Sequence, residues 1–222
     1  MKLQKGEGEP EKNIPYREAV GSLMHLAIVS RPDIMFAVSL VSRFLNCYTQ
    51  MHWNAVKKIF KYLKATKDYG LCYTKTTQTS EITGYSEADY ANDLDTRRSV
   101  TGYVFMKSGA AVTWSSQKQQ TVALSTTEAE FRAACAATKE AMWIKQLLSD
   151  IGEYKQDTLC LHLDNQSAIS VIKNVNFHKR CKHIETKYHF IKEKYHQKLI
   201  SLIDTSNLYC ANSKSVLYSR GV

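Results

Sequence analysis

The sequence predicts an α/β chain in which a small helical module precedes a mixed five-stranded sheet flanked by helices. Apolar residues before residue 75 recur at helical spacing, whereas the patterns after residue 81 begin with three strands and then alternate helices with strands. The 222 residues, 44% hydrophobic and 23% charged, are enough for one large core or two small ones. Both observations favour a folded chain over a disordered one.

Residues 1–13 are polar and charged, and we expect them to be a disordered lead-in. They lack the apolar segment of a signal peptide, and no apolar run approaches the roughly 18 residues that a transmembrane helix needs. Six widely spaced cysteines without a C-x-x-C pair indicate free thiols rather than a disulfide scaffold. We therefore expect an intracellular protein, cytoplasmic or nuclear, without a membrane partner.

Residues 14–75 are predicted to form the helical module. Helical spacing begins near Pro15. Pro32, followed by Asp33, marks the start of a second helix, because proline is favoured in the first helical turn. A third helix is predicted over residues 53–65.

The third helix has two faces of different character. One face is apolar, and the other carries Lys57, Lys58, Lys61 and Lys64. A solvated amphipathic surface helix explains this pattern, and so does a basic ridge beside a nucleic-acid backbone. The sequence leaves both interpretations open.

After Leu71–Thr74, which has the pattern of a short strand, the polar residues 76–80 are predicted to link the module to a second one at residues 81–207, with a divergent tail at 208–222. Strands and helices of the second module follow from their periodicity. We predict strands at Ile82–Tyr90, Thr101–Met106 and Ala111–Trp114, a helix at Thr126–Ile151, a strand at Leu159–Leu163, helices at Gln166–Lys173 and His183–Gln197, and a strand at Leu199–Ile203.

Local signals refine these elements. Gly109 suits the turn of a hairpin, and Ser125 with Glu128 forms a capping-box start for the long helix. The tryptophans, which fit apolar patterns and are predicted to lie in the core, are Trp53, Trp114 and Trp143.

Acidic residues stand at strand ends and at the start of the long helix. Glu87 and Asp89 share a face of the first strand, because side chains alternate along a strand. Glu130 lies in the first turns of the long helix, and Asp164 ends an apolar strand just before a helix, where ligands collect in open α/β sheets. Together they form a carboxylate set of the kind that binds two Mg²⁺ ions for phosphoryl displacement.

Each of these acids also has an ordinary structural explanation. Asp164 can cap the following helix, and Glu130 can be a first-turn acid that the helix dipole favours. Glu87 and Asp89 can face water on an edge strand. The sequence leaves these alternatives open.

The chain carries 30 Lys and Arg against 21 Asp and Glu, a formal net charge of +9, which favours a polyanionic partner. Basic residues and histidines gather at residues 178–198. A zinc site that includes Cys181 matches no standard spacing, so we favour a handle that binds nucleic acid over zinc or a solvated helix. The residues predicted to contact nucleic acid are Asn165, Ser167, Lys179, Arg180, Lys182, His183 and Lys187.

Several uncommon strings occur along the chain in a fixed order. They are PYREAVGSL at Pro15–Leu23, RPDI at Arg31–Ile34, HWNAVK at His52–Lys57, TGY at Thr101–Tyr103, VALSTTEAE at Val122–Glu130, LDNQSA at Leu163–Ala168 and KHIETKYHFI at Lys182–Ile191. With them the chain resembles, over residues 13–207, the C-terminal part of the Pol polyprotein of copia-type (Ty1/copia) LTR retrotransposons.

The resemblance implies a thumb or connection segment of a reverse transcriptase at residues 14–75 and an RNase H-like fold at residues 81–207. The implied activity is metal-dependent cleavage of the RNA strand of RNA–DNA hybrids, with Mg²⁺ or Mn²⁺ as cofactor. The remainder of a reverse transcriptase is an implied partner. The family's Tyr-x-Asp-Asp polymerase string does not occur in this chain, so DNA synthesis is not expected of it alone.

The family's catalytic acids fall on Glu87, Glu130 and Asp164, and the fourth falls on Asn212, which has no charge. Glu87 stands where the family has aspartate. Its extra methylene moves a metal-bound oxygen by more than about 1 Å, a displacement that can cost about a hundredfold in rate.

The resemblance therefore implies an impaired enzyme. We expect Asp89 to substitute in part for Glu87, and Asp204 or a water molecule to complete the metal shell. Two alternatives stay open: a catalytically inactive nucleic-acid-binding remnant or co-opted interaction module, and a fragment without a selected role.

Overall fold

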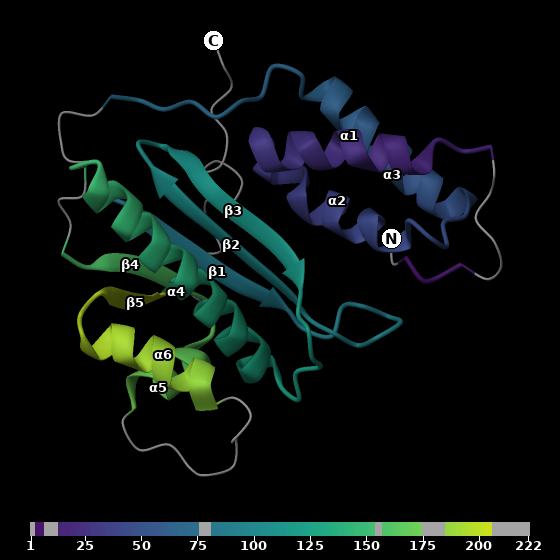
Figure 1. Ribbon diagram of the computed structural model, residues 1–222. Helices are drawn as coiled ribbons and strands as arrows, with labels where there is room; N and C mark the ends of the chain where they lie inside the picture. Colours follow the sequence, from purple (N-terminus) through teal and green to yellow (C-terminus); the bar gives the residue numbers. More distant parts are fainter. Residues whose placement is uncertain (1–2, 7–12, 76–80, 154–156, 175–184, 206–222) are drawn as a thin grey trace.

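The computed structural model describes residues 3–6, 13–75, 81–153, 157–174 and 185–205, with side chains of the last stretch described from residue 189. A group of helices lies beside a twisted sheet, and a long helix crosses the face of that sheet (Figure 1). Each part has its own hydrophobic core. The division into a helical module and an α/β module, with its boundaries, stays a prediction.

The helical module follows the predicted pattern closely. Its buried residues Tyr16, Val20, Leu23 and Ala27 recur three or four positions apart along the first helix, as a single buried face requires. The elements are α1 (Tyr16–Val29), η1 (Pro32–Ile34), α2 (Met35–Val41), η2 (Ser42–Phe44) and α3 (Gln50–Ala65).

The sheet holds five strands in the order β3-β2-β1-β4-β5. The pairs β1–β2 and β2–β3 are antiparallel, whereas β1–β4 and β4–β5 are parallel. This mixed sheet with flanking helices confirms the RNase H-like α/β fold class that was expected. The strands are β1 (Thr83–Asp89), β2 (Val100–Lys107), β3 (Ala110–Lys118), β4 (Leu159–Leu163) and β5 (Ile200–Asp204).

Three helices complete the second module: α4 (Thr126–Asp150), α5 (Gln166–Lys173) and α6 (Glu185–His196). Helix α4 packs on β1 and β2, and α5 and α6 pack beside it. Two glycines with positive φ follow elements: Gly109 (φ 87°) turns the β2–β3 hairpin as predicted, and Gly152 (φ 74°) follows α4.

The two modules are joined by specific contacts. Trp114 on β3 donates an indole hydrogen bond of 2.8 Å to the carbonyl of Ala27 at the end of α1. Asp93, in the β1–β2 connection, forms ion pairs with Arg43 of η2 (3.0 Å) and Lys118 of β3 (3.2 Å). Because Asp93 is buried, these pairs are less screened by water than surface pairs.

Two predictions about connecting segments need correction. The expected disorder is wrong for residues 3–6: Leu3 is buried in the helical core, and the amide of Lys5 bonds to the Asp95 carboxylate. The expected strand at Leu71–Thr74 is not a strand. Instead, the backbone amide of Thr74 donates a hydrogen bond to the carbonyl of Ser108 in the β2–β3 turn. This contact, rather than a strand ladder, holds the segment beside the hairpin.

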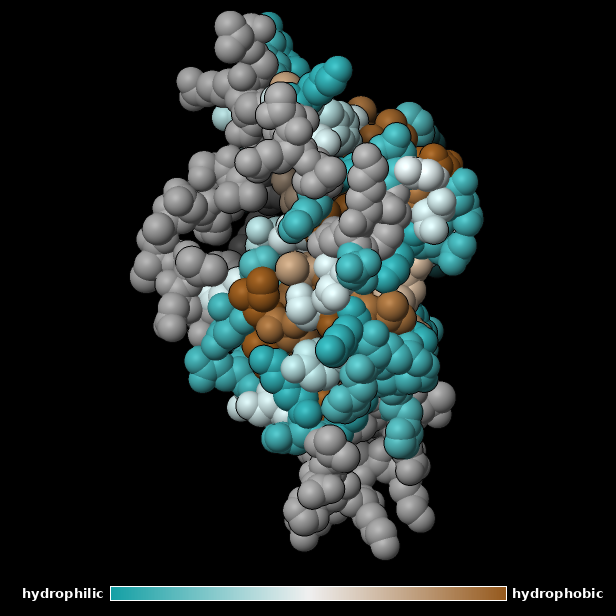
Figure 2. All heavy atoms as spheres, turned by 90° about the vertical axis from the view of Figure 1, so that its left-hand side faces the viewer, coloured by the Kyte–Doolittle hydropathy of each residue, from teal (hydrophilic) through white to brown (hydrophobic). Residues whose placement is uncertain are grey.

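The prediction that Trp143 belongs to the core is also wrong. Trp143 is 56% exposed on α4, and Leu147 and Ile151 follow at four-residue spacing, 43% and 61% exposed. Figure 2 views the molecule from the side where α4 ends and shows hydrophobic patches among hydrophilic atoms. Apolar periodicity on α4 therefore marks two faces, of which only one is buried.

Candidate active site

The ends of β1 and β4 bring two of the predicted acids to one edge of the sheet. The strands are parallel, with Tyr85 opposite His162 in the register. These two rings stack at 4.7 Å between centroids, with an angle of 18° between their planes. Glu87 and Asp164 each lie two residues further along, so both follow this stacked pair toward the same edge.

Glu130 reaches this edge from the other side of β1. Its Oε1 accepts a hydrogen bond of 3.0 Å from the amide of Ala88, the residue after Glu87. The Glu130 residue is only 8% exposed, and its Oε2 is buried without a hydrogen-bond partner in the described part of the chain. Helix α4 therefore delivers a buried carboxylate to the end of β1.

The helix-dipole explanation for Glu130 does not hold, because another residue has that role. Glu128 is the first-turn acid: its amide bonds to the Ser125 hydroxyl (3.1 Å), and its Oε2 accepts from the amide of Leu124 (2.8 Å). Glu128 also pairs with Arg132 one turn later. Because Ser125 and Glu128 already accept hydrogen bonds from backbone amides at the helix start, Glu130 is not needed as a cap.

The capping explanation for Asp164 is also wrong. The side chain that caps α5 is that of Asn165, whose Oδ1 accepts a hydrogen bond of 2.8 Å from the amide of Ala168. Asp164 keeps one carboxylate oxygen, Oδ1, buried and without a hydrogen-bond partner among the residues that the structure describes. A buried unpaired carboxylate oxygen is costly, so this position needs a different explanation.

The edge-strand explanation for Glu87 fails on topology, since β1 lies between β2 and β4 in the middle of the sheet. The Glu87 side chain is nevertheless exposed, because it stands where β1 passes the end of β4. Asp89 is exposed as well and accepts a hydrogen bond from the side chain of Asn92.

Burial and mutual repulsion change the acidity of this group. Burial raises the pKa of Glu130 to about 7; the Ala88 amide opposes the rise, and the charges of Asp164 and Glu87 add to it. Partial desolvation, and then the charges of Asp164 and Asp89, raise the pKa of Glu87. Glu87, Glu130 and Asp164 therefore interact electrostatically, and we call them the carboxylate group.

The donor chemistry of the carboxylate group suits a divalent cation, because Mg²⁺ prefers carboxylate oxygens. Glu130 and Asp164 each offer an oxygen without a protein partner. In the part of the chain that the structure describes, however, no three Asp, Glu, His or Cys side chains lie close enough to hold one ion together. The group thus has the ligands for a metal site without being closed around it.

Asp204, the other predicted metal ligand, lies at the end of β5 opposite Leu163. That register puts it on the face of the buried leucines, away from the face of Tyr85 and Glu87. Its role as a metal ligand stays a prediction.

Among the predicted nucleic-acid contacts, Asn165 uses its side-chain oxygen for the α5 cap, and Ser167 is exposed in the first turn of α5. The remaining residues lie outside the described side chains: Lys179, Arg180, Lys182, His183 and Lys187, together with Cys181 of the zinc hypothesis.

Sequence reasoning missed one residue near this site, Gln119. It is buried directly after β3 and bonds to both β2 and α4. No local pattern distinguishes it, because its role depends on contacts between segments that are distant in the sequence.

Comparison with known proteins gives relatives over most of the chain. It is 46% identical over 180 residues, 81% of its length, to the retrovirus-related Pol polyprotein from transposon TNT 1-94 of Nicotiana tabacum. It is 37% identical over 191 residues to the corresponding polyprotein from transposon RE2 of Arabidopsis thaliana. Over most of its length the chain is similar to retrovirus-related Pol polyproteins from transposons.

The chain spans 13% of the length of each of those two polyproteins. A shorter relative, the secreted RxLR effector protein 161 of Plasmopara viticola, is 47% identical over 133 residues, which cover 60% of this chain and 93% of that protein. No protein-family model matches the chain. Within the described residues, every helix is too short or too polar to span a bilayer.

Two solved structures give a weak overlap. LC11-RNase H1, isolated from compost, is 14% identical with a TM-score of 0.45, over 61% of this chain and 91% of the other. The foamy viral protease-reverse transcriptase in complex with dsDNA is 11% identical with a TM-score of 0.42, over 92% of this chain and 39% of the other.

Proposed function

We propose that this chain is a retrotransposon RNase H module that uses divalent metal to cut the RNA strand of RNA–DNA hybrids, and that its activity is impaired. The observation that supports the proposal best is the pair of buried carboxylate oxygens, on Glu130 and Asp164, that have no hydrogen-bond partner among the described residues. Desolvated carboxylates that repel one another destabilise a fold, and such groups concentrate at functional sites. A bound cation would relieve the repulsion.

In this proposal Glu130 and Asp164 hold the metal, and Glu87 contributes a third carboxylate from β1. Two Mg²⁺ ions, when bound, would stabilise the attacking and leaving oxygens of the phosphodiester. The chain's own residues supply the placement: the Ala88 amide orients Glu130, and the Asn165 cap leaves the Asp164 carboxylate available.

The impairment rests on Glu87. Its exposed side chain is one methylene longer than aspartate, and Mg²⁺ tolerates little distortion of its octahedron. Asp89 shares the strand face of Glu87 and is the nearest substitute on β1. Because the described carboxylates do not close around one ion, the proposed activity is weak rather than full.

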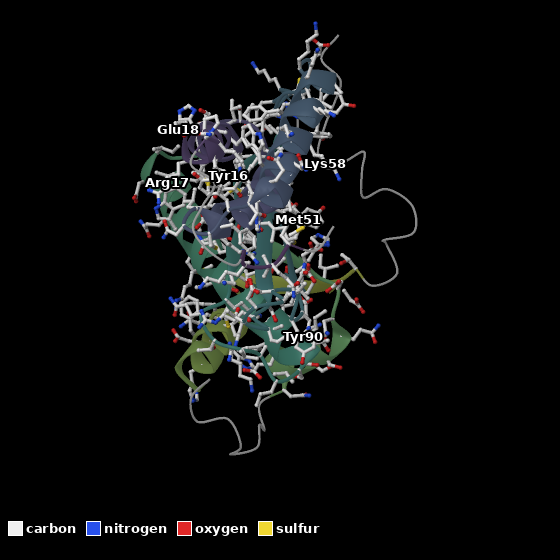
Figure 3. All side chains as sticks on the ribbon, turned by 90° about the vertical axis from the view of Figure 1, so that its right-hand side faces the viewer. Tyr16, Arg17, Glu18, Met51, Lys58 and Tyr90 are labelled. Atoms are coloured by element: carbon white, nitrogen blue, oxygen red, sulfur yellow. The ribbon has the colours of Figure 1, made fainter. Side chains whose placement is uncertain are left out.

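The proposed partner is an RNA–DNA hybrid, with the rest of a reverse transcriptase as a second partner. The net charge of +9 supports a polyanionic ligand. Lys57, Lys58, Lys61 and Lys64 are exposed on α3, which contains no acidic residue. Figure 3 shows Lys58 and Met51 projecting on one side of α3.

A second candidate is a nucleic-acid-binding module without catalysis. The incomplete metal geometry and Glu87 favour it. Under this reading the fold and the basic surface persist, hybrids bind with strong salt dependence, and no strand is cut.

Cleavage of a labelled RNA–DNA hybrid by the purified chain, with Mg²⁺ and then Mn²⁺, separates the two candidates. Wild type, Glu87→Asp and Asp164→Asn are compared at equal concentration. We expect weak cutting of the RNA strand by wild type, a gain in Glu87→Asp of about tenfold or more, and loss in Asp164→Asn.

Each alternative outcome has a definite meaning. Binding without cleavage in both wild type and Glu87→Asp would reject the enzyme in favour of the binding module. Equal activity of Asp164→Asn and wild type would show that the cutting comes from a contaminant or from another site.

A further inference from the structure

We infer that Gln119 is a positioning residue that joins the start of α4 to β2 and thereby holds Glu130 against the end of β1. Its importance for catalysis rests on the proposed function, whereas its effect on Glu130 does not.

The Gln119 side chain connects two elements. The residue is 8% exposed and follows directly after β3. Its amide nitrogen Nε2 donates to the hydroxyl of Thr101 on β2 and to the carbonyl of Ala129 on α4, both at 3.0 Å. Its backbone amide donates to the carbonyl of Ser99 at 2.8 Å. Backbone and side chain are therefore both fixed.

The orientation of the amide follows from its partners. The Ala129 carbonyl can only accept, so the nitrogen of Gln119 must face it. This leaves Oε1 buried, with no hydrogen-bond partner within the described ranges of the chain. A methionine or leucine would fill this space without an unpaired polar atom, so the two bonds to Thr101 and Ala129 are the physical advantage of glutamine here.

These contacts form a closed ring around the end of β1 that carries Glu87. Thr101 lies opposite Ala88 in the β1–β2 register. The Ala88 amide bonds to Glu130, and Glu130 follows Ala129 in the chain. Gln119 bonds Ala129 to Thr101 and so completes the ring. We call this contact the Gln119 bridge.

The bridge fixes the position of the first turns of α4. Gln119 bonds to the Ala129 carbonyl, one residue before Glu130, and to Thr101 on β2, so it ties this part of the helix to the sheet. A displacement of about 1 Å at a reacting group can cost about a hundredfold in rate, so the bridge determines whether Glu130 stays within reach of a bound cation.

Native-state hydrogen exchange, followed by NMR, tests the bridge at the Ala88 amide. The test variant is Gln119→Met, which keeps the volume and removes both donors. The matched control is Thr138→Val, which removes a buried side-chain hydrogen bond (2.8 Å to the Ala134 carbonyl) within the same helix, about two turns beyond Glu130. Exchange at Ala88 is compared with exchange at Leu161 in the centre of β4.

We expect the Ala88 amide to exchange about tenfold faster in Gln119→Met, with Leu161 unchanged, because the loss of a hydrogen bond opens that contact locally. Thr138→Val should leave the ratio of the two rates as in wild type. An unchanged Ala88 rate in folded Gln119→Met overturns the inference, and so does an equal acceleration in Thr138→Val.

Failure of the proposed function is distinguishable from failure of the bridge. If wild type cuts no hybrid with either metal, the enzyme proposal is lost, but the exchange rate at Ala88 still decides the bridge. If wild type does cut, Gln119→Met should lower kcat with little change in KM. A rise in KM alone would assign Gln119 to substrate binding instead.

Discussion

Glu130 extends from α4 to the backbone of β1, where its Oε1 accepts a 3.0 Å hydrogen bond from the amide of Ala88. One oxygen is thus held, while the other stays buried and has no hydrogen-bond partner among the residues described. The contact places an ionisable group at the end of a central strand, within the field of two further carboxylates. The stability of the chain should therefore depend on the charge of Glu130.

Replacement of Glu130 by glutamine should stabilise the chain at high pH. The pKa of Glu130 is about 7 in the fold, against 4.5 ordinarily, so the folded state binds the proton more tightly. That stabilisation is complete below pH 4.5 and disappears as pH rises through 7, a change of about 3 kcal/mol. Urea unfolding at pH 4 and pH 8 should show a gain for Glu130→Gln at pH 8 only. An equal gain in stability at both pH values would contradict this prediction.

Divalent metal should raise the melting temperature of wild type at pH 8. A cation bound by the carboxylate group neutralises the repulsion between Glu130 and Asp164, and a ligand that binds only the folded state stabilises it. Thermal melts with and without Mn²⁺ should show the increase in wild type and in the control Asp150→Asn, an exposed acid at the end of α4. The same increase in Asp164→Asn would place the metal elsewhere.

Asp93 should stabilise the chain until strongly acid pH. Burial alone would raise its pKa, but hydrogen bonds from Thr96 and the charge of Lys118 lower it to about 2, from 3.8. Because the pKa is lower in the fold, this stabilisation is present above pH 3.8 and is lost as pH falls through 2. Asp93→Asn should cost about 2 kcal/mol at pH 7 by urea unfolding. The exposed neighbour Asp95 provides the control variant Asp95→Asn, which should cost much less.

The hydrogen bond between Trp114 and Ala27 should stabilise the contact between the modules. Trp114→Phe keeps an aromatic ring at this position but removes the indole N–H donor. We therefore expect a loss of about 1 kcal/mol in the free energy of unfolding. Trp143→Phe, on the exposed face of α4, should change it little. Comparable losses in the two variants would mean that the bond at Ala27 contributes nothing specific.

The lysines of α3 should contribute to hybrid binding. In the double variant Lys57→Gln/Lys61→Gln, the affinity should fall and the slope of log affinity against log salt should decrease by about one to two units, if each lysine contacts a phosphate. Fluorescence anisotropy at several salt concentrations measures both quantities. Lys139→Gln, an exposed lysine on α4, is the control. An unchanged slope would support the solvated-helix interpretation.

Much of the fold was predictable from the sequence because its causes are local. Apolar spacing predicted the helices and strands, and Gly109 predicted the β2–β3 turn. Position within these elements also predicted that Glu87, Glu130 and Asp164 matter together, and the charges they exert on one another support it. Their roles as metal ligands remain a prediction.

Only the tertiary structure decided between the alternatives that each acid allowed. Asn165 rather than Asp164 caps α5, and Glu128 rather than Glu130 completes the start of α4. Neighbouring residues compete for such roles with nearly equal local preferences, and packing of helix on sheet selects between them. Gln119 bonds β2 to α4 across gaps of 18 and 10 residues. Such contacts form only once the sheet register and the position of α4 are set, so no local sequence pattern predicts them.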